Sequence, residues 1–303
     1  MVFAQADRAP RGPLAWLATA TPRLTGAIPP TAQVLLGIVS VQIGAALAKH
    51  LFATAGATGV VALRLVFAAA VLLLIWRPSL RVDRRTLTVV VGYGVVLAAM
   101  NTLFYLALDR IPLGIAVTVE FLGPLTLALA GSRRWLDALW ALLAGAGVVL
   151  LARGGEGDVS VVGLLLALGA GLCWAGYILL GAALGRASAD GTGLALAMGV
   201  AGLVVLPIGA LDAGAGLLSP TVLLVGLGVA LMSSVIPYSL ELEALRKIPP
   251  RVFGVLMSLE PAVAAIAGLV VLREALAPYQ WVAICCVVAA SAGATRYARS
   301  PDA

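Results

Sequence analysis

The stretch FGVLMSLEPAVAAIAGLVVL, residues 253–272, decides the fold class of this chain. Nineteen of its twenty residues carry no charge, and a helix of about twenty apolar residues crosses the roughly 30 Å hydrocarbon core of a bilayer. Glu260 and Pro261 nevertheless stand near its middle. A carboxylate and a missing backbone N–H both cost free energy in a membrane, so this pair indicates a function or a special packing role.

The composition of the whole chain agrees with a membrane protein. Hydrophobic residues make up 62% of the 303 residues and charged residues 11%, and the mean hydropathy is +1.07. A soluble protein of this length needs more polar surface, so we predict an all-α protein that crosses the membrane many times. The net charge of +6 is expected in loops that set the topology, and it does not imply a nucleic-acid partner.

The sequence lacks the motifs of catalysis and metal binding. It contains one histidine, His50, and no Walker-type nucleotide motif. Its three cysteines, Cys173, Cys285 and Cys286, lie in apolar runs without the spacing of metal ligands or of a disulfide framework. We therefore expect no enzymatic activity, no cofactor and no metal site.

Ten apolar runs of membrane-spanning length follow one another along the chain. They cover residues 32–52, 58–76, 86–108, 112–131, 135–152, 160–182, 192–211, 219–241, 250–272 and 276–297. The proline-rich residues 1–31 are expected to form a disordered cytoplasmic tail, and residues 298–303 a short second tail.

Basic residues indicate the orientation of these spans. With ten spans and a cytoplasmic N-terminus, fifteen of the 20 lysines and arginines fall on the cytoplasmic side. Four lie on the opposite side, namely Lys49, Arg110, Arg153 and Arg273, and Arg64 lies inside a span. Because positively charged loops tend to stay in the cytoplasm, we predict that both termini are cytoplasmic.

The two halves of the chain resemble each other. The stretch LDRIPLGIAVTVEFLGP (108–124) aligns with LRKIPPRVFGVLMSLEP (245–261) at an offset of 137 residues, and both the Ile-Pro pairs and the final prolines coincide. We predict a first five-helix repeat over 32–152 and a second over 160–297. Since five is odd, the second repeat must enter the membrane upside down, as in many secondary transporters.

Two carboxylates lie deep within predicted spans. Glu120 is about eight residues into the fourth span and Glu260 about ten residues into the ninth, or roughly 12 Å and 15 Å at 1.5 Å per residue. Because these spans run in opposite directions, both carboxylates are expected near the bilayer centre. Such residues commonly face a hydrated cavity on a substrate or proton path. The alternative is that each one only pairs with a donor inside the helix bundle.

Arg64, in the stretch VALRLVFAAAVLLL, is the natural counter-charge. It could bind a substrate carboxylate through two parallel hydrogen bonds, pair with Glu120, or extend toward the membrane surface, and the sequence leaves these roles open. Polar and aromatic residues inside other spans could line a pocket for a small polar molecule, or only join helices. They are Gln42, Asn101, Tyr105, Trp174, Tyr177, Ser233, Ser234 and Tyr238.

Prolines and the remaining charges complete the expectations. Pro237 and the Gly-Pro and Glu-Pro pairs are expected to interrupt helices and to free carbonyl groups that another group must satisfy. Lys49 is expected to anchor the end of the first span, and Glu241 to pair with Arg246. Positions at the rim of the bundle are expected for Asp109, Arg110 and Glu274.

Several of these stretches resemble the EamA family of the drug/metabolite transporter superfamily. The resemblance runs from about residue 32 to 297, and it is most specific in PLGIAVTVEFLGPL and in the pair of stretches PYSLE and FGVLMSLEPA. It implies ten transmembrane helices in two inverted five-helix repeats, a place in the bacterial inner membrane, and the efflux of small metabolites.

The function that this resemblance implies is export of small neutral amino acids such as threonine or homoserine, and the buried charges add the expectation of proton antiport with alternating access. The expected partners are the amino acid, protons and the lipid bilayer, and a homodimer is left open. Alternatives are an exporter of drugs or other metabolites on the same scaffold and, more remotely, a membrane scaffold or enzyme. The residues predicted to bind substrate or protons are Glu120, Glu260, Arg64, Asn101, Tyr105, Trp174, Tyr177 and Tyr238.

Overall fold

The computed structural model describes residues 28–78, 82–130, 135–152, 159–187, 192–245 and 247–297. Within these ranges the chain forms helices and no strands, which confirms the predicted all-α class. Nearly all of the predicted N-terminal tail, and all of the C-terminal one, lie outside the described residues. The first helix begins at Pro30, two residues before the predicted start of the first span.

The first half of the chain contains five spans. They are α2 (Pro30–His50), α3 (Phe52–Trp76), α4 (Arg84–Leu108), α5 (Leu113–Glu120) with α6 (Leu122–Ala130), and α7 (Trp135–Ala152). The fourth span is divided in two by a break at Phe121.

The second half forms helices at its five predicted spans, and three of these include short irregular segments. They are α8 (Val161–Ala187), α9 (Thr192–Ala213) with the 3₁₀ segment η1 (Gly214–Leu218), α10 (Pro220–Ala230) with the π-helical η2 (Leu231–Val235) and α11 (Ile236–Leu245), α12 (Pro250–Met257) with α13 (Glu260–Ala267) and the π-helical η3 (Gly268–Leu272), and α14 (Pro278–Tyr297).

Nine of these spans are long and apolar enough to cross a membrane, counted over the described ranges. The remaining predicted span contains a shorter apolar helix, Ala138–Leu151 within α7. The runs of apolar residues therefore located nine candidate spans and one shorter helix of the described chain, with ends that differ from the predicted ones by a few residues in most cases.

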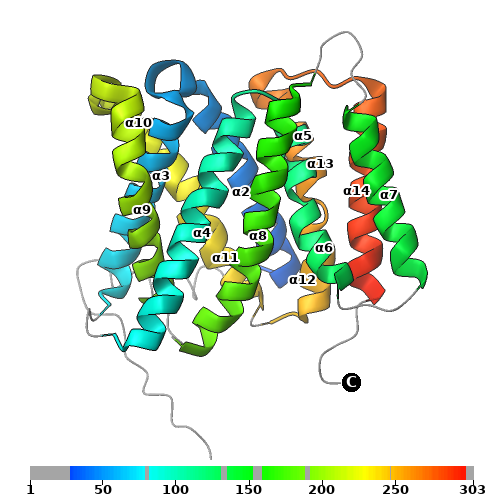
Figure 1. Ribbon diagram of the computed structural model, residues 1–303, viewed down its shortest axis with the longest axis horizontal. Helices are drawn as coiled ribbons and strands as arrows, with labels where there is room; N and C mark the ends of the chain where they lie inside the picture. The colour runs from blue at the N-terminus through cyan, green and yellow to red at the C-terminus, as the bar shows by residue number, and fades with distance from the viewer. Residues whose placement is uncertain are drawn as a thin grey trace, which may run out of the picture.

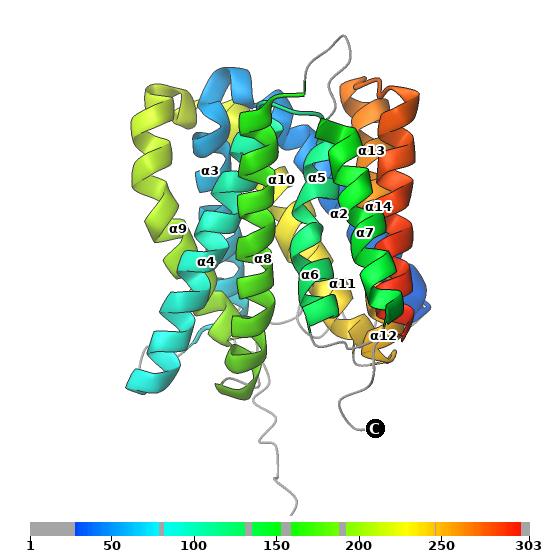
Figure 2. The ribbon, with the colours of Figure 1, turned by 45° about the vertical axis from the view of Figure 1, so that its right-hand side comes forward.

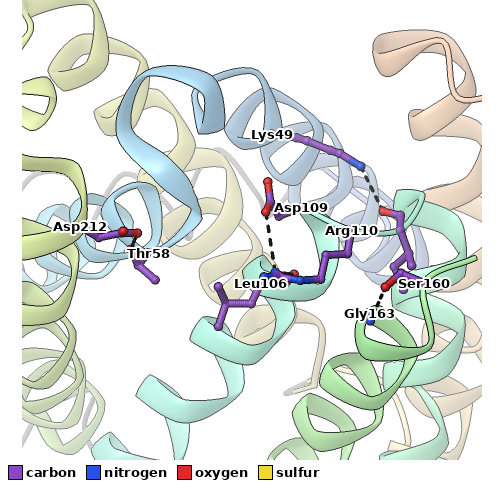
Figure 3. Close-up of polar contacts among 9 residues, drawn as sticks. Lys49, Thr58, Leu106, Asp109, Arg110, Ser160, Gly163 and Asp212 are labelled. Carbon is purple, nitrogen blue, oxygen red and sulfur yellow. Dashed lines mark hydrogen bonds and ion pairs between the residues drawn. The ribbon is translucent and has the colours of Figure 1, made fainter.

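The second span departs most from its predicted bounds. It was expected at 58–76, but helix α3 already begins at Phe52 and contains a kink at Gly56, whose φ of 63° lies in the left-handed region that favours glycine. The predicted span thus corresponds to the regular helix after the kink. Asp212 of α9 accepts a hydrogen bond from the Thr58 hydroxyl beside this kink (Figure 3).

Local sequence explains where several helices begin. Proline opens α2, α10 and α12, in the first turn, where its missing N–H would have no partner inside the helix anyway. Asp83 caps α4 by accepting hydrogen bonds from the amides of Arg85 and Thr86, both at 3.1 Å. Hydrogen bonding to Thr86, and to Arg85, holds the pKa of the exposed Asp83 carboxyl below its usual range.

The helices form one bundle in which the two halves interlock (Figures 1 and 2). Helix α3 packs on α9, α7 on α14, and α5 on α13. Helix α4 packs on α8 and α9, and in the same way α10 and α11 of the second half pack on α3 and α2 of the first. The pattern of contacts is therefore nearly unchanged when the two halves are exchanged.

Helix ends in the two halves are related by the offset that the sequence alignment predicted. His50, Trp76, Leu108 and Glu120 end helices in the first half, and the residues 137 positions later, Ala187, Ala213, Leu245 and Met257, end helices in the second. The broken spans run in opposite directions, since α5 leads down into α6 whereas α12 leads up into α13 (Figures 1 and 2).

The upper end of the bundle in Figure 1 is where α5 begins and η3 ends. There α5 and α13 cross closely, and a methyl group added to Gly114 would lie 2.6 Å from the Cα atom of Ala265. Helices α6 and α12, the equivalent pair at the lower end, pack far less extensively than α5 and α13 in the described part of the chain. The two ends are thus packed differently.

Candidate functional site

Both buried glutamates lie where a span is interrupted. Glu120 is the last residue of α5, directly before the break at Phe121, and Glu260 is the first residue of α13, directly after the break at Ser258 and Leu259. The two breaks begin at equivalent positions of the halves, since Phe121 and Ser258 are 137 residues apart. Each glutamate is 8% exposed.

Glycines bring helix α8 against the first break. A methyl group added to Gly123 would lie 1.8 Å from the carbonyl oxygen of Gly171 on α8, and one added to Gly171 would lie 2.5 Å from the carbonyl oxygen of Glu120. Neither position can hold a side chain without moving backbone atoms. The location of Glu120 is therefore set by backbone-to-backbone contact.

Arg64 of α3 is buried and hydrogen-bonded on three sides. Its Nη2 donates to the carbonyl oxygen of Ser233 at 2.9 Å, its Nη1 to the Tyr105 hydroxyl at 3.2 Å, and its Nε to the Ser234 hydroxyl at 3.3 Å. The guanidinium carbon lies 5.5 Å from the centre of the Tyr105 ring, within the range of a cation–π contact. Arg64 is 6% exposed, so of the three roles left open for it, extension to the membrane surface is not observed.

The Ser233 carbonyl accepts its hydrogen bond from Arg64 because Pro237 cannot supply the usual helical donor. In a regular helix the N–H of residue 237 would bond to the carbonyl of residue 233, but proline has no N–H. The π-helical turn η2 similarly frees the carbonyl of Met232, which accepts a hydrogen bond from the Ser40 hydroxyl of α2 at 2.8 Å. The predicted interruption at Pro237 is confirmed, and α2 and α3 satisfy the freed groups.

Glu120 lies within electrostatic range of Arg64 and Glu260 but forms no hydrogen bond with either side chain. Its carboxylate interacts through space with both charges, and it forms no hydrogen bond or ion pair with the residues that the structure describes. Of the three roles left open for Arg64, direct pairing with Glu120 is therefore not observed.

Glu260 has a direct partner in α2. The Gln42 side chain donates to Glu260 Oε1 with a distance of 3.2 Å from Nε2, and Gln42 is 3% exposed. The other oxygen of each side chain, Glu260 Oε2 and Gln42 Oε1, is buried without a hydrogen-bond partner among the described residues. Glu241 interacts electrostatically with Glu260, and its predicted partner Arg246 lies outside the described residues.

Three tyrosines extend this polar centre. The ring of Tyr177 in α8 packs against that of Tyr93 in α4 with ring centres 4.7 Å apart and planes tilted by 37°. The Tyr177 hydroxyl interacts with those of Tyr93 and Tyr238. Tyr238 of α11 lies within electrostatic range of both Arg64 and Glu260. Tyr177 and Tyr238 thus lie within electrostatic range of charged residues of this centre.

Two predicted site residues make other contacts. The Asn101 amide donates to the carbonyl of Leu97 in its own helix at 2.9 Å, which favours a packing role. Trp174 meets Phe121 edge to face, with ring centres 5.4 Å apart, directly beside the first break. The structure therefore brings together Arg64, Tyr105, Glu120, Tyr177, Tyr238 and Glu260, and leaves Asn101 bonded to its own helix.

An ion pair joins the two halves at the upper end. Lys49 Nζ lies 2.7 Å from Glu274 Oε1 and donates to the carbonyl of Ile111 at 3.1 Å, while Glu274 Oε2 accepts from the amide of Leu113 at 2.8 Å. Lys49 is drawn in Figure 3 near the Asp109–Arg110 pair, whose side chains are exposed. Glu274 was predicted at the rim, but it is a partly buried link between α2, α5 and the end of η3.

Four residues of this centre are not among the site residues predicted from the sequence. Gln42, Ser233 and Ser234 were noted as polar residues inside spans but were not selected as site residues, and Tyr93 was not noted. Their polarity inside apolar runs was the available signal. It does not distinguish a residue at the centre from one at any other helix contact.

A bundle of membrane-spanning helices with a charged, hydrogen-bonded centre is typical of a membrane transporter. Residues 161–296 match the EamA-like transporter family. The chain is 45% identical over 271 residues to the threonine/homoserine exporter RhtA of Escherichia coli (strain K12), covering 88% of this chain and 91% of that protein. It belongs to the EamA-like transporter family and is a multi-pass protein of the bacterial inner membrane, not an enzyme.

Other comparisons agree with this family. RhtA of Salmonella typhimurium (strain LT2) is 44% identical, with the same coverage. The uncharacterized transporter YwfM of Bacillus subtilis is 28% identical over 233 residues, covering 73% of this chain and 77% of that protein. One crystal structure superposes with a TM-score of 0.62 over 88% of this chain and 98% of that chain, and at 20% identity it supports the fold alone.

Proposed function

We propose that this protein exports small neutral amino acids of the threonine and homoserine kind, by proton antiport with alternating access. The observation that carries the proposal is the polar centre, in which Glu120 and Glu260 lie at two helix breaks with Arg64 nearby. The high identity to exporters named for threonine and homoserine supports this substrate class.

The proposal includes two inverted repeats with cytoplasmic termini. The constant offset of 137 residues between helix ends, the exchangeable packing pattern and the opposite directions of α5–α6 and α12–α13 all support an internal two-fold relation. Transporters built in this way bind their substrates between the repeats and rock one repeat against the other.

A zwitterion matches the charges of the centre. Arg64 uses three of its five N–H groups on protein acceptors, which leaves two for a substrate carboxylate. The ammonium group is then attracted to the carboxylates of Glu120 and Glu260. A proton that neutralises Glu260 would remove this attraction and release the substrate, so proton entry and amino-acid exit become alternatives at one site.

Reconstituted protein with an imposed pH gradient tests this coupling. We expect an inward proton gradient to drive threonine against its own gradient, and we expect Glu260→Gln to lower the driven flux at least about tenfold, which is the usual effect of losing a hydrogen bond to a charged group. Asp109→Asn, at an exposed rim position, is the matched control and should transport normally. Flux that ignores pH in the wild type, together with full activity of Glu260→Gln, would contradict proton antiport.

A second candidate is export of an aromatic or drug-like metabolite on the same scaffold. The Trp174–Phe121 contact beside the first break and the tilted Tyr93–Tyr177 ring pair favour it, because they place aromatic surface next to the charges. A panel of labelled amino acids and dyes in the same vesicles separates the two. Threonine flux that is blocked by homoserine but unaffected by the dyes supports the first candidate.

A further inference from the structure

The hydrogen-bonded pair of Gln42 and Glu260 leaves two buried acceptors without a donor. Gln42 Nε2 and Glu260 Oε1 are 3.2 Å apart, while Gln42 Oε1 and Glu260 Oε2 have no hydrogen-bond partner in the described part of the chain. The two side chains are 3% and 8% exposed. Buried polar atoms without partners are rare, because each one loses its bonds to water and gains none in return.

The orientation of the amide is fixed by its neighbour. Reversing Gln42 would place its oxygen against Glu260 Oε1, and two acceptors in contact repel each other. The amide nitrogen faces Glu260 Oε1, and the two unmatched atoms are both oxygens. A group that carries several donors and a positive charge is the chemical complement of this arrangement.

A primary ammonium group has this chemistry, with three N–H donors, one positive charge and no acceptor. We infer that Gln42 and Glu260 together form the subsite that binds the ammonium group of the substrate, an inference that rests on the proposed function. Other carboxylates increase the negative charge there, since Glu120 and Glu241 both interact electrostatically with Glu260. The positive charge of Arg64 repels a cation, so the ammonium group is disfavoured next to the guanidinium group.

The subsite defines a requirement on the substrate. Molecules with a free primary ammonium group should bind, and molecules in which this group is absent or acylated should not. Threonine and threoninol therefore belong to the accepted class, because both keep the ammonium group. 3-Hydroxybutanoate and N-acetylthreonine keep the hydroxyl and the carboxylate of threonine and belong to the rejected class.

Competition in proteoliposomes tests the requirement. Exchange of labelled threonine is measured against these four unlabelled competitors, for the wild type and for Gln42→Leu. In the wild type we expect 3-hydroxybutanoate and N-acetylthreonine to compete at least about 100-fold more weakly than threonine. Gln42→Leu should raise the KM for threonine about tenfold and reduce this discrimination by the same factor, since a hydrogen bond to a charged group contributes about that much to affinity.

Gln33→Leu is the matched control. Gln33 is a buried glutamine of the same helix, but it donates to the carbonyl of Ile28 at the beginning of α2, far along the helix from Glu260. Its replacement should leave the discrimination unchanged, even if it lowers stability. If Gln42→Leu does not fold, Gln42→Asn serves instead, because it keeps the amide and shortens its reach by one methylene group.

The outcomes separate the inference from the proposed function. A wild type that exchanges no threonine contradicts the proposed function, whatever the variants do. A wild type that exchanges threonine, but is inhibited equally by 3-hydroxybutanoate, overturns the ammonium subsite alone. Unchanged discrimination in folded Gln42→Leu or Gln42→Asn also overturns it.

Discussion

At the scale of the residue, Arg64 connects a structural role with a proposed functional one. It satisfies a carbonyl that Pro237 leaves unbonded, and the same guanidinium stands across from Glu120. A buried arginine with protein acceptors on three sides is held in place before any substrate arrives. Its remaining N–H groups are therefore oriented in advance, which lowers the entropy that binding would otherwise cost.

Replacing Arg64 by lysine tests this structural role. Lysine cannot reach the three acceptors together, so we expect the Ser233 carbonyl to lose its donor and the free energy of unfolding to fall by about 1–3 kcal/mol. Chemical denaturation in mild detergent measures the change. Arg110→Lys, at an exposed position, should be neutral.

A second substitution shows whether the Ser233 carbonyl is the cause. Pro237→Ala supplies the N–H that proline lacks, so it should recover part of the stability that Arg64→Lys removes. Strict additivity of the two substitutions in a double-mutant cycle would show that they act independently, contrary to this explanation.

The sequence could predict some contacts of this centre and not others. Glu120, Glu260 and Arg64 were identifiable because a charge inside an apolar run is costly and therefore rarely accidental. The bond from Arg64 to the Ser233 carbonyl was not identifiable, because every residue has a carbonyl and only the fold shows which one is free. The Gln42–Glu260 pair was hidden for a similar reason, since the two residues are 218 positions apart.

At the scale of the element, the broken helices are positioned by glycine. Gly123 and Gly171 let α8 approach the break after Glu120 so closely that backbone atoms are in contact. Run length alone predicted each broken span as one helix, since an interruption of one or two residues does not change its hydropathy. The Gly-Pro and Glu-Pro pairs correctly indicated that these helices are interrupted. The π-helical turn η2 had no sequence signal beyond Pro237.

Gly171→Ala tests this arrangement. The added methyl group would lie 2.5 Å from the Glu120 carbonyl oxygen, so α8 and α5 must separate, and we expect at least a tenfold loss of transport together with a lower melting temperature. Gly185→Ala is the control on the same helix, because a methyl group there meets no atom within 4 Å. Equal behaviour of the two variants in a flux assay would refute the role of this contact.

At the scale of the whole molecule, the two ends of the bundle differ although the two halves are alike. The upper end is closed by the crossing of α5 and α13 and by the Lys49–Glu274 ion pair, which joins the first half to the second. Alternating access requires such a closure to open once in each cycle. In the proposed cycle, this structure corresponds to the state in which the upper end is shut.

A cross-link across this end tests the proposed cycle. Lys49→Cys with Glu274→Cys, in a chain whose own Cys173, Cys285 and Cys286 are replaced by alanine, is treated with a short cleavable thiol cross-linker. We expect the cross-linked protein to stop exchanging substrate and the cleaved protein to recover. Each single cysteine variant treated in the same way should stay active. Full exchange by the cross-linked protein would mean that this end does not need to open.

Glu274 accepts a hydrogen bond from the amide of Leu113 at the start of α5, and this bond affects how much of the protein adopts each conformation when no substrate is bound. The offset that relates the halves places Asp137 and Arg186 at the positions of Glu274 and Lys49, but it places Pro250 at the position of Leu113. Proline has no N–H, so an equivalent ion pair at the opposite end of the bundle would lack the hydrogen bond from a backbone amide to its carboxylate. Without substrate, the protein should therefore mostly populate the conformation seen here. Pro250→Leu should make the populations of the two conformations more equal.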